Sequence, residues 1–499
     1  MASIKKKVDL IGYSHNRDSN YKVTADEIFN LINNFTDQQE FDELYNYFDK
    51  KYQLPKLVVR QKIRQYLATT YLYKQGKFEN KLCIKNIPKS ILRYGALIYA
   101  LFFVKINIKT QKFKLIIDDI YSSLELKRFE RLLNLVGKDK VLCITRNIDI
   151  KQEFPECRIH NKKKFRDFEL VSLLKSIFYE FSSGIWLAIK VSFKTRTNLL
   201  PVSLQIVHSY LSFKTLFESN ISKYMIQERH HKTNPIKNYL FKKTGGMAST
   251  TIQKNIFQTD PMFFYMDTDI LFSLGQSGFS EFLEYGGHVQ DIVPVGSLAM
   301  EYDWFSSIDV TYSMEKKYDV LFLGINLADR MDSYNGFLED YYSSFKWLAR
   351  FKKENPNYKV GIIHHSSQKI VDEVELEILV NSGVEVIDKN DNSYLAAFSS
   401  HCAVTYGSTM GYELNAHKLP TFFVDPGGRC TFLPSNKNDF QDSIQMKSYE
   451  SFSESVKAIL ADNEIELLTD EQSSRLCLNS SAVSEKIYSS LHFINKPYA

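Results

Sequence analysis

Short apolar runs alternate with amphipathic stretches through the second half of the chain, as in a parallel sheet with crossover helices. Each run ends in a polar or glycine-containing loop, so we expect strands and helices to alternate from about residue 221 onward. Strands are predicted at 223–228, 248–255, 269–275, 291–298, 318–326, 358–367, 384–388, 402–406 and 421–424, and helices at 235–246, 278–287, 333–356, 371–383, 392–400, 448–461 and 481–493.

The first part of the chain follows this rhythm only in places. A strand, helix and strand are predicted at 112–118, 122–137 and 140–146. Residues 1–80 show helical spacing, with Thr24 as an N-cap and Glu27 three positions later. We interpret them as a helical accessory segment, because they carry no catalytic pattern.

An almost wholly apolar run at 91–104 is flanked by lysines and interrupted by Arg93. It is too short to span a bilayer upright, so it either contacts a membrane surface or forms a buried core element. A second basic region opens at Lys162–Lys164 and continues as a helical stretch to about residue 220. The lysines that flank the run at 91–104 favour membrane-surface contact for that run.

These boundaries predict an α/β protein with two Rossmann-like domains facing a cleft. Residues 300–317 are polar and irregular, and we interpret them as a linker. The expected parts are the helical segment 1–80, an N-terminal acceptor domain with a basic helical insertion at 81–305, a C-terminal donor domain at 318–480 and a closing helix at 481–499.

Length and composition are consistent with this division. A chain of 499 residues is too long for one hydrophobic core. The six cysteines form no CxxC pair, so we expect no disulfide framework and no metal site, and a reducing compartment. The N-terminal basic residues precede no apolar core, so no signal peptide is expected.

The net charge of +5 hides an asymmetry between the two halves. Residues 1–250 carry 44 Lys and Arg against 23 Asp and Glu, whereas the remainder carries 19 against 35. The basic half predicts contact with a polyanion or an anionic membrane surface. Nucleic acid is not expected, because no nucleic-acid-binding motif accompanies the charge. Alternatively, the two halves attract each other across a cleft.

The stretch Ser399–Asp425 reads as strand, turn, helix and strand, with small hydroxyl residues where the helix begins. The start of a helix has unpaired backbone N–H groups and a positive dipole end, so it suits an anion. Ser408 and Thr409 add hydroxyl groups, and Glu413 lies one turn later, where it would accept from sugar hydroxyls. This pattern predicts a nucleotide phosphate site. The alternative is an ordinary N-cap of a buried crossover helix.

Two further loops, Gly324–Asn326 and His364–Ser367, end strands of the same predicted sheet. Loops at the carboxyl ends of an open α/β sheet converge on one crevice. A histidine there can hydrogen-bond a phosphate or, as an imidazolium, balance the charge of a leaving group. The predicted donor site therefore comprises Gly324, Asn326, His364, His365, Ser366, Gly407, Ser408, Thr409, Met410, Gly411 and Glu413.

Two Rossmann-like halves joined near residue 310 look like a GT-B glycosyltransferase. The order IIHHSS, DNSY, YGSTMGYE and FFVDPGG resembles bacterial surface-carbohydrate and capsule biosynthesis transferases. The HHS and GST elements are similar to the His-Pro and Ser/Thr motifs of bacterial sialyltransferase-like enzymes, which use CMP-activated sugars. This chain departs from that pattern at Ser366, which replaces the proline, and at Asp118-Asp119-Ile120, which lacks the glycine of the acid-acid-glycine motif.

The resemblance implies an inverting, metal-independent transfer from a nucleotide-sugar co-substrate, with no further cofactor. Such a transfer needs stabilisation of the departing phosphate, a task that fits His365, Ser408 and Thr409.

The transfer also needs a base for the acceptor hydroxyl. We expect the base on the N-terminal domain, where the candidates are Glu228, then His231 in the QERHH segment, then Asp119. The alternatives are a solvated loop for QERHH, and a solvated strand end or a helix N-terminal charge for Asp118-Asp119.

We therefore expect a cytoplasmic enzyme, peripheral to the inner face of the membrane, that extends a lipid-linked bacterial surface glycan such as capsule or lipopolysaccharide. The alternatives are a CDP-polyol phosphotransferase of the same layout and a non-catalytic membrane-surface scaffold. A nucleotide-sugar epimerase is a further alternative, which would need carboxylates in the cleft.

Overall fold

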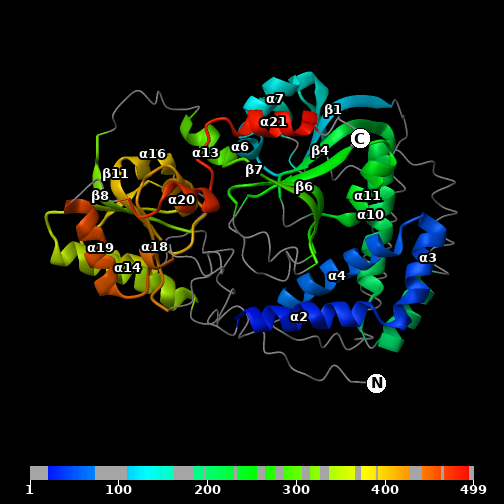
Figure 1. Cartoon of the computed structure of the whole chain (residues 1–499), viewed down its shortest axis with the longest axis horizontal. Coiled ribbons are helices and arrows are strands. Elements are labelled where there is room, and N and C mark those ends of the chain that lie inside the picture. Colours follow the sequence, from blue (N-terminus) through cyan, green and yellow to red (C-terminus); the bar gives the residue numbers. More distant parts are fainter. Residues whose placement is uncertain are drawn as a thin grey trace.

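The computed structural model describes residues 21–73, 110–145, 147, 149–161, 184–195, 197–229, 233–254, 265–276, 286–305, 315–325, 337–365, 373–388, 391–427, 441–461 and 466–493. Within them the chain forms two α/β domains that lie side by side (Figure 1). The predicted apolar run at 91–104, the lysines at 162–164, most of the helix at 278–287 and the site residues His231, Asn326 and Ser366 lie outside the described residues.

The first sheet has seven parallel strands in the order β3-β2-β1-β4-β5-β6-β7. All six residues from Leu115 to Ile120 of β1 are buried, because helices cover both faces of the sheet. The strands are β1 (Gln111–Ile120), β2 (Val141–Thr145), β3 (Arg158–Asn161), β4 (Asn220–Gln227), β5 (Ala248–Ile252), β6 (Asp267–Ser273) and β7 (His288–Pro294).

Side chains of β1 alternate between the two faces and so join two cores. Ile116 packs with α2, α3, α4, α10 and α11, whereas Leu115 and Ile117 pack with α6, α7 and α21. These helices are α2 (Tyr21–Thr36), α3 (Asp42–Tyr52), α4 (Lys56–Tyr73), α6 (Ser123–Lys127), α7 (Glu130–Val136), α10 (Leu200–Ser219), α11 (Pro235–Lys243) and α21 (Val483–Phe493), with 3-10 turns at Gln39–Phe41 and Lys138–Lys140 and a short α8 (Ile150–Glu153).

The N-terminal helices form a structural layer of the first domain. Gln65 on α4 donates to the carbonyls of Thr233 (3.1 Å) and Tyr265 (2.7 Å). The helical prediction for this segment is confirmed over its described part, residues 21–73. The predicted cap is wrong, because α2 already includes Thr24.

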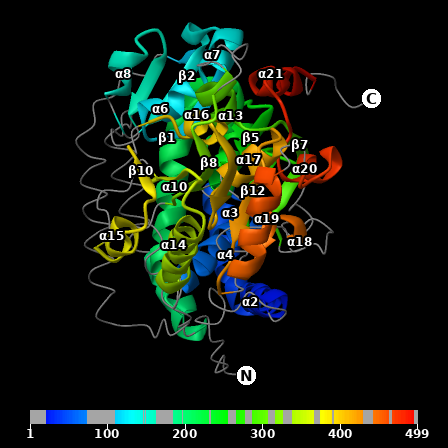
Figure 2. The same cartoon turned by 90° about the vertical axis from the view of Figure 1, so that its left-hand side faces the viewer.

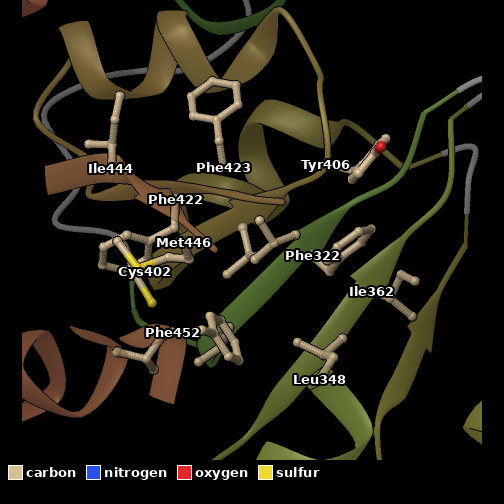
Figure 3. Close-up of a cluster of buried hydrophobic side chains, with 14 of the residues drawn as sticks. Phe322, Leu348, Ile362, Cys402, Tyr406, Phe422, Phe423, Ile444, Met446 and Phe452 are labelled. Carbon is tan, nitrogen blue, oxygen red and sulfur yellow. The ribbon is translucent and has the colours of Figure 1, made fainter. Parts of the chain in front are cut away.

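The second sheet has six parallel strands in the order β10-β9-β8-β11-β12-β13. Figure 3 shows its core, in which Phe322, Ile362 and Cys402 from three strands meet Phe452 of α19. The elements are β8 (Tyr318–Leu323), β9 (Val360–Ile363), β10 (Glu385–Ile387), β11 (Ser400–Thr405), β12 (Thr421–Val424), β13 (Gln445–Met446), α14 (Phe337–Glu354), α15 (Glu373–Val380), α16 (Ser393–Phe398), α17 (Met410–Ala416), α18 (Gln441–Ile444), α19 (Tyr449–Ala461) and α20 (Asp470–Leu476).

Two segments pass between the domains. The predicted linker, 300–317, begins at the last residue of α13 (Leu298–Met300) and continues as a π-helical turn (Glu301–Phe305), so its first part is helical rather than irregular. The chain later returns to the first domain, where α21 lies beside α7 (Figures 1 and 2). The Ser484 amide, just inside α21, donates to both carboxylate oxygens of Glu301 at 3.0 and 3.2 Å.

Two all-parallel sheets, each wrapped by helices and linked by a helical crossover, constitute the expected α/β arrangement of two Rossmann-like domains, the GT-B layout. The prediction of fold class is therefore confirmed. Among the described residues, no helix is long and apolar enough to cross a membrane.

Candidate functional site

Each sheet reverses its strand order at one place. In the first sheet, β2 and β3 lie on one side of β1 and β4 to β7 lie on the other, so the switch point is between β1 and β4. In the second sheet, the equivalent point is between β8 and β11. Open α/β sheets bind ligands at the carboxyl ends of the strands beside such a point. The candidate site therefore consists of residues at these two positions.

Two glutamates lie at the first switch point. Glu228 follows β4, and its backbone N–H donates to the carbonyl of Asp118 at 3.0 Å, which extends the ladder between β1 and β4. Glu125 lies on α6, directly after β1. Its backbone N–H donates to the N-cap hydroxyl of Ser122 (3.3 Å), and the Tyr121 amide donates to its Oε2 (2.6 Å). Strand ends and a helix cap thus hold both carboxylates.

Two cations connect these carboxylates. Lys254 Nζ lies 2.5 Å from Glu125 Oε1 and 2.5 Å from Glu228 Oε1. Arg229 donates to Glu125 Oε1, and its Nε lies 3.3 Å from Glu228 Oε2. The Arg229 guanidinium also lies over the Tyr121 ring, 4.4 Å from its centroid. Side-chain exposures of 9% to 22% leave this network partly open to solvent.

The two carboxyl groups have different proton affinities. Burial raises the pKa of Glu228 to about 7, although Lys254 acts in the opposite direction. Burial also acts on Glu125, but Lys254, the Tyr121 amide and Arg229 outweigh it, so the pKa of Glu125 lies below its ordinary value. Near neutral pH, Glu125 is a fixed negative charge and Glu228 can gain or lose a proton.

The aspartates at the end of β1 are buried. Asp118 is 0% and Asp119 6% exposed, so the alternative of a solvated strand end is wrong. Lys237 Nζ, also buried, lies 2.5 Å from Asp118 Oδ2 and 3.4 Å from Asp119 Oδ2. Asp119 has a left-handed backbone, with φ of 67°. Of the predicted bases, Glu228 is thus tied to Lys254 and Arg229 in the partly open network, whereas Asp119 faces the buried Lys237.

At the second switch point, Thr405 organises the predicted phosphate loop. Its hydroxyl donates to the carbonyl of Leu323 (3.0 Å) and accepts from the amides of Gly407 (3.3 Å) and Ser408 (3.1 Å). The Met410 amide is bonded to the Ser408 hydroxyl at 3.3 Å. These amides therefore already have partners inside the protein. The partly exposed hydroxyl residues Ser408 and Thr409 remain at the edge of the sheet.

The glycines of this region allow close packing. A Cβ atom on Gly411 would lie 2.5 Å from Cζ of Phe423, so α17 approaches β12 more closely than a side chain would permit. A Cβ atom on Gly324 would lie 3.2 Å from Cα of His364. Both glycines thus have a structural role in addition to the predicted role at the donor site.

Glu413 is buried inside the protein. Its Oε1 accepts from the Ser297 hydroxyl and its Oε2 from the Tyr394 hydroxyl, each at 2.5 Å. The side chain is 4% exposed, and burial raises its pKa. The prediction that Glu413 accepts from sugar hydroxyls is not met in this structure, because protein hydroxyl groups occupy both oxygens. Glu413 instead connects α17 to the crossover between the domains.

The two histidines after β9 differ in environment. His364 is buried, and its Nε2 lies 2.8 Å from Oε1 of Glu375, a residue of α15 that is 0% exposed. His365 is exposed. Successive side chains of an extended segment point to opposite sides, which explains the difference. Of the two, His365 is the more accessible to a ligand.

Sequence reasoning identified Glu228 but missed Glu125, Lys254 and Glu375. Glu125 had a local signal, because Ser122 and Glu125 have capping-box spacing directly after a strand. Lys254 follows β5, so its place at a strand end was a weaker signal. Glu375 had no signal in the sequence.

No protein-family model and no curated protein sequence matches this chain. Solved structures do match in fold. The MnaA–UDP co-structure from S. aureus shares 12% identity over 76% of this chain and 96% of its own, with a TM-score of 0.48. A putative UDP-N-acetylglucosamine 2-epimerase from Listeria monocytogenes shares 10% identity over 78% and 99%, with a TM-score of 0.46. The UDP-GlcNAc 2-epimerase from Neisseria meningitidis, bound to UDP-GlcNAc, shares 9% over 77% and 100%, also at 0.46. Similarities at this level decide nothing about the activity of this chain.

Proposed function

We propose that the protein is a glycosyltransferase that moves a sugar from a nucleotide-activated donor to an acceptor hydroxyl, with Glu228 as the base. The proposal rests on the divided carboxyl pair at the first switch point, in which the pKa of Glu228 is about 7 and that of Glu125 is lowered. Two neighbouring carboxyl groups with separated pKa values are suited to different roles in acid–base chemistry. A base works best when its pKa lies near the operating pH.

In the proposed reaction, the acceptor oxygen attacks the anomeric carbon of the donor sugar and its proton passes to Glu228. A C–O bond to the acceptor forms while the C–O bond to the donor phosphate breaks, and that electron pair leaves with the nucleotide. Glu125 holds Lys254 beside Glu228. His365, Ser408 and Thr409 at the second switch point are proposed to bind the departing phosphate.

The proposed acceptor is a lipid-linked bacterial surface glycan, such as a capsule or lipopolysaccharide precursor, at the cytoplasmic face of the membrane. The excess of 44 basic over 23 acidic residues in the first half supports an acceptor at an anionic surface. A CMP-linked donor is an expectation from the HHS and GST elements alone. The identity of the donor nucleotide is therefore the first property to determine.

A nucleotide panel tests the donor. The change in Tm is measured with CMP, UMP, CDP and UDP, since a ligand stabilises the fold by RT ln(1 + [L]/Kd). Transfer is then measured with radiolabelled CMP-, UDP- and CDP-activated donors. We expect one nucleotide family to raise Tm and its sugar donor to be consumed. Transfer of a polyol phosphate from a CDP donor would support the phosphotransferase alternative instead.

A matched pair of variants tests the base. Glu228→Gln should lower kcat roughly 10²- to 10⁴-fold, the usual contribution of a general base. Its nucleotide-induced change in Tm should stay that of the wild type. The control Glu130→Gln removes an exposed carboxylate on α7 and should leave both unchanged. Normal turnover of Glu228→Gln would contradict the assigned base, and stabilisation by no nucleotide would contradict the proposed function.

A nucleotide-sugar epimerase is the second candidate, because the first switch point holds the carboxylates that such an enzyme needs. Glu228 would then remove a proton from a sugar carbon instead of a hydroxyl. One measurement distinguishes the epimerase from the transferase. An epimerase incubated with its donor in D₂O and no acceptor returns donor with carbon-bound deuterium, whereas the proposed transferase leaves the donor unlabelled.

A further inference from the structure

The helix at residues 184–195 exposes aromatic side chains on one face. Trp186 is 69% and Phe193 59% exposed. Among the large apolar side chains that are exposed in the described part of the chain, these two are the aromatic ones. Aromatic side chains bury large areas when they pack against another surface. Their exposure on a helix therefore indicates a site of contact with another molecule or a membrane.

The helix carries apolar side chains on two faces, one buried and one exposed. Trp186 and Phe193 are seven residues apart, so they lie on the same side of an α-helix, with the partly buried Ile189 between them. The other side packs inward through Ile185, Ala188 and Val191, and Val191 belongs to the core that includes α3, α4 and α10. The domain core therefore fixes the direction in which the aromatic side chains point.

Basic side chains lie beside this aromatic face. Lys190 and Lys194 both pair with Glu43 on α3, at 2.7 and 2.8 Å, so two cations share one carboxylate and the group keeps a positive charge. The surrounding sequence from 162 to 196 contains eight Lys and Arg against three Asp and Glu. An aromatic stripe with basic neighbours complements an anionic bilayer, where rings enter the headgroup region and lysines reach the phosphates.

We propose that this face, defined by Trp186, Ile189 and Phe193, docks the protein on an anionic lipid surface. The inference rests on the proposed function in one respect, since that surface would carry the lipid-linked acceptor. The helix lies in the plane of the interface and does not cross the bilayer. The net positive charge that Lys190 and Lys194 leave beside the aromatic side chains favours an anionic bilayer as the partner.

Vesicle co-sedimentation of the full chain tests the proposal. The wild type should sediment with vesicles containing phosphatidylglycerol and remain in the supernatant with phosphatidylcholine alone. Trp186→Ser/Phe193→Ser should weaken binding to the anionic vesicles at least tenfold. The control Leu376→Ser/Val380→Ser removes two exposed apolar side chains from α15 of the second domain, which are 43% and 71% exposed, and should bind as the wild type does.

Two further measurements complete the test. Brominated lipids should quench tryptophan fluorescence of the wild type and not of Trp186→Phe. Equal vesicle binding by the wild type and the Trp186/Phe193 double variant would overturn the proposal. A change of oligomeric state in that variant, with unchanged vesicle binding, would assign the face to a second copy and also overturn it. Vesicle binding needs no turnover, so a failure of the proposed transferase activity is seen separately, as absent transfer to a soluble acceptor.

Discussion

The chemistry available at the first switch point depends on four side chains, those of Glu125, Glu228, Arg229 and Lys254. Lys254 contacts both Glu125 and Glu228, which are 129 and 26 positions away in the sequence. The sequence predicted Glu228 because a polar residue at the end of a buried strand is visible in the pattern. The partner of that residue was not predictable, because pairing over such separations depends on strand order and crossover geometry.

Removing Lys254 should shift the pH dependence of the reaction. Lys254 lowers the pKa of Glu228 against the effect of burial, so Lys254→Met should raise that pKa above about 7. The base must be ionised to work, and loss of one close opposite charge should move the acid limb of kcat/KM about one to three pH units upward. The limb is measured between pH 5 and 10 with saturating acceptor.

Lys138→Met is the control for this experiment, because Lys138 pairs at 3.4 Å with an exposed carboxylate, that of Glu130, away from the switch point. Its pH profile should match that of the wild type. A Lys254→Met enzyme with an unshifted acid limb, and Tm equal to that of the wild type, would show that Glu228 is not the titrating base.

At the scale of elements, the strands and most long helices follow from hydrophobic periodicity. Every strand predicted from 223 onward is present, although β9 ends at Ile363, so His364 and His365 follow the strand instead of belonging to it. The pattern missed α20 despite its Thr469–Gln472 capping box, because seven residues give little periodic signal. Tertiary packing supports this helix, since a Cβ on Gly275 of the first domain would lie 2.5 Å from the Arg475 carbonyl.

The packing of α17 on β12 gives a prediction about stability. Gly411→Ala places a methyl group 2.5 Å from Cζ of Phe423, and overpacking of this kind should lower the free energy of unfolding by about 1–3 kcal/mol. Urea denaturation measures the change. Phe423→Leu removes the opposing ring atom, so the double variant should lose less than the sum of the two single variants. Additive losses would mean that the two residues do not compete for space.

At the scale of the whole molecule, the domains are joined by buried and partly buried polar contacts in addition to chain connections. Ser297 lies where the chain leaves the first domain, and its hydroxyl contacts Glu413 on α17 of the second. Arg128 on the first domain pairs with Asp303 of the crossover at 2.8 Å, and Asn392 of the second donates to the Asp303 carbonyl at 2.8 Å. The residue predicted as a sugar ligand therefore takes part in domain coupling, which a linear motif could not reveal.

Ser297→Ala should weaken this coupling. It removes a hydrogen bond from a buried carboxyl and the N-cap of α13, so the free energy of unfolding should fall by about 1–3 kcal/mol. The Ser297 hydroxyl lowers the pKa of Glu413, so its loss raises the folded-state pKa further. A carboxyl group whose pKa is raised on folding makes the protein less stable as pH rises through that pKa. The loss of stability in Ser297→Ala should therefore be larger at pH 8 than at pH 5.

Ser297→Thr retains the hydroxyl and is the control. Urea denaturation at both pH values, with limited proteolysis of the crossover, measures the effect, and a deficit that shrinks with rising pH would rule out a carboxylate-specific contact.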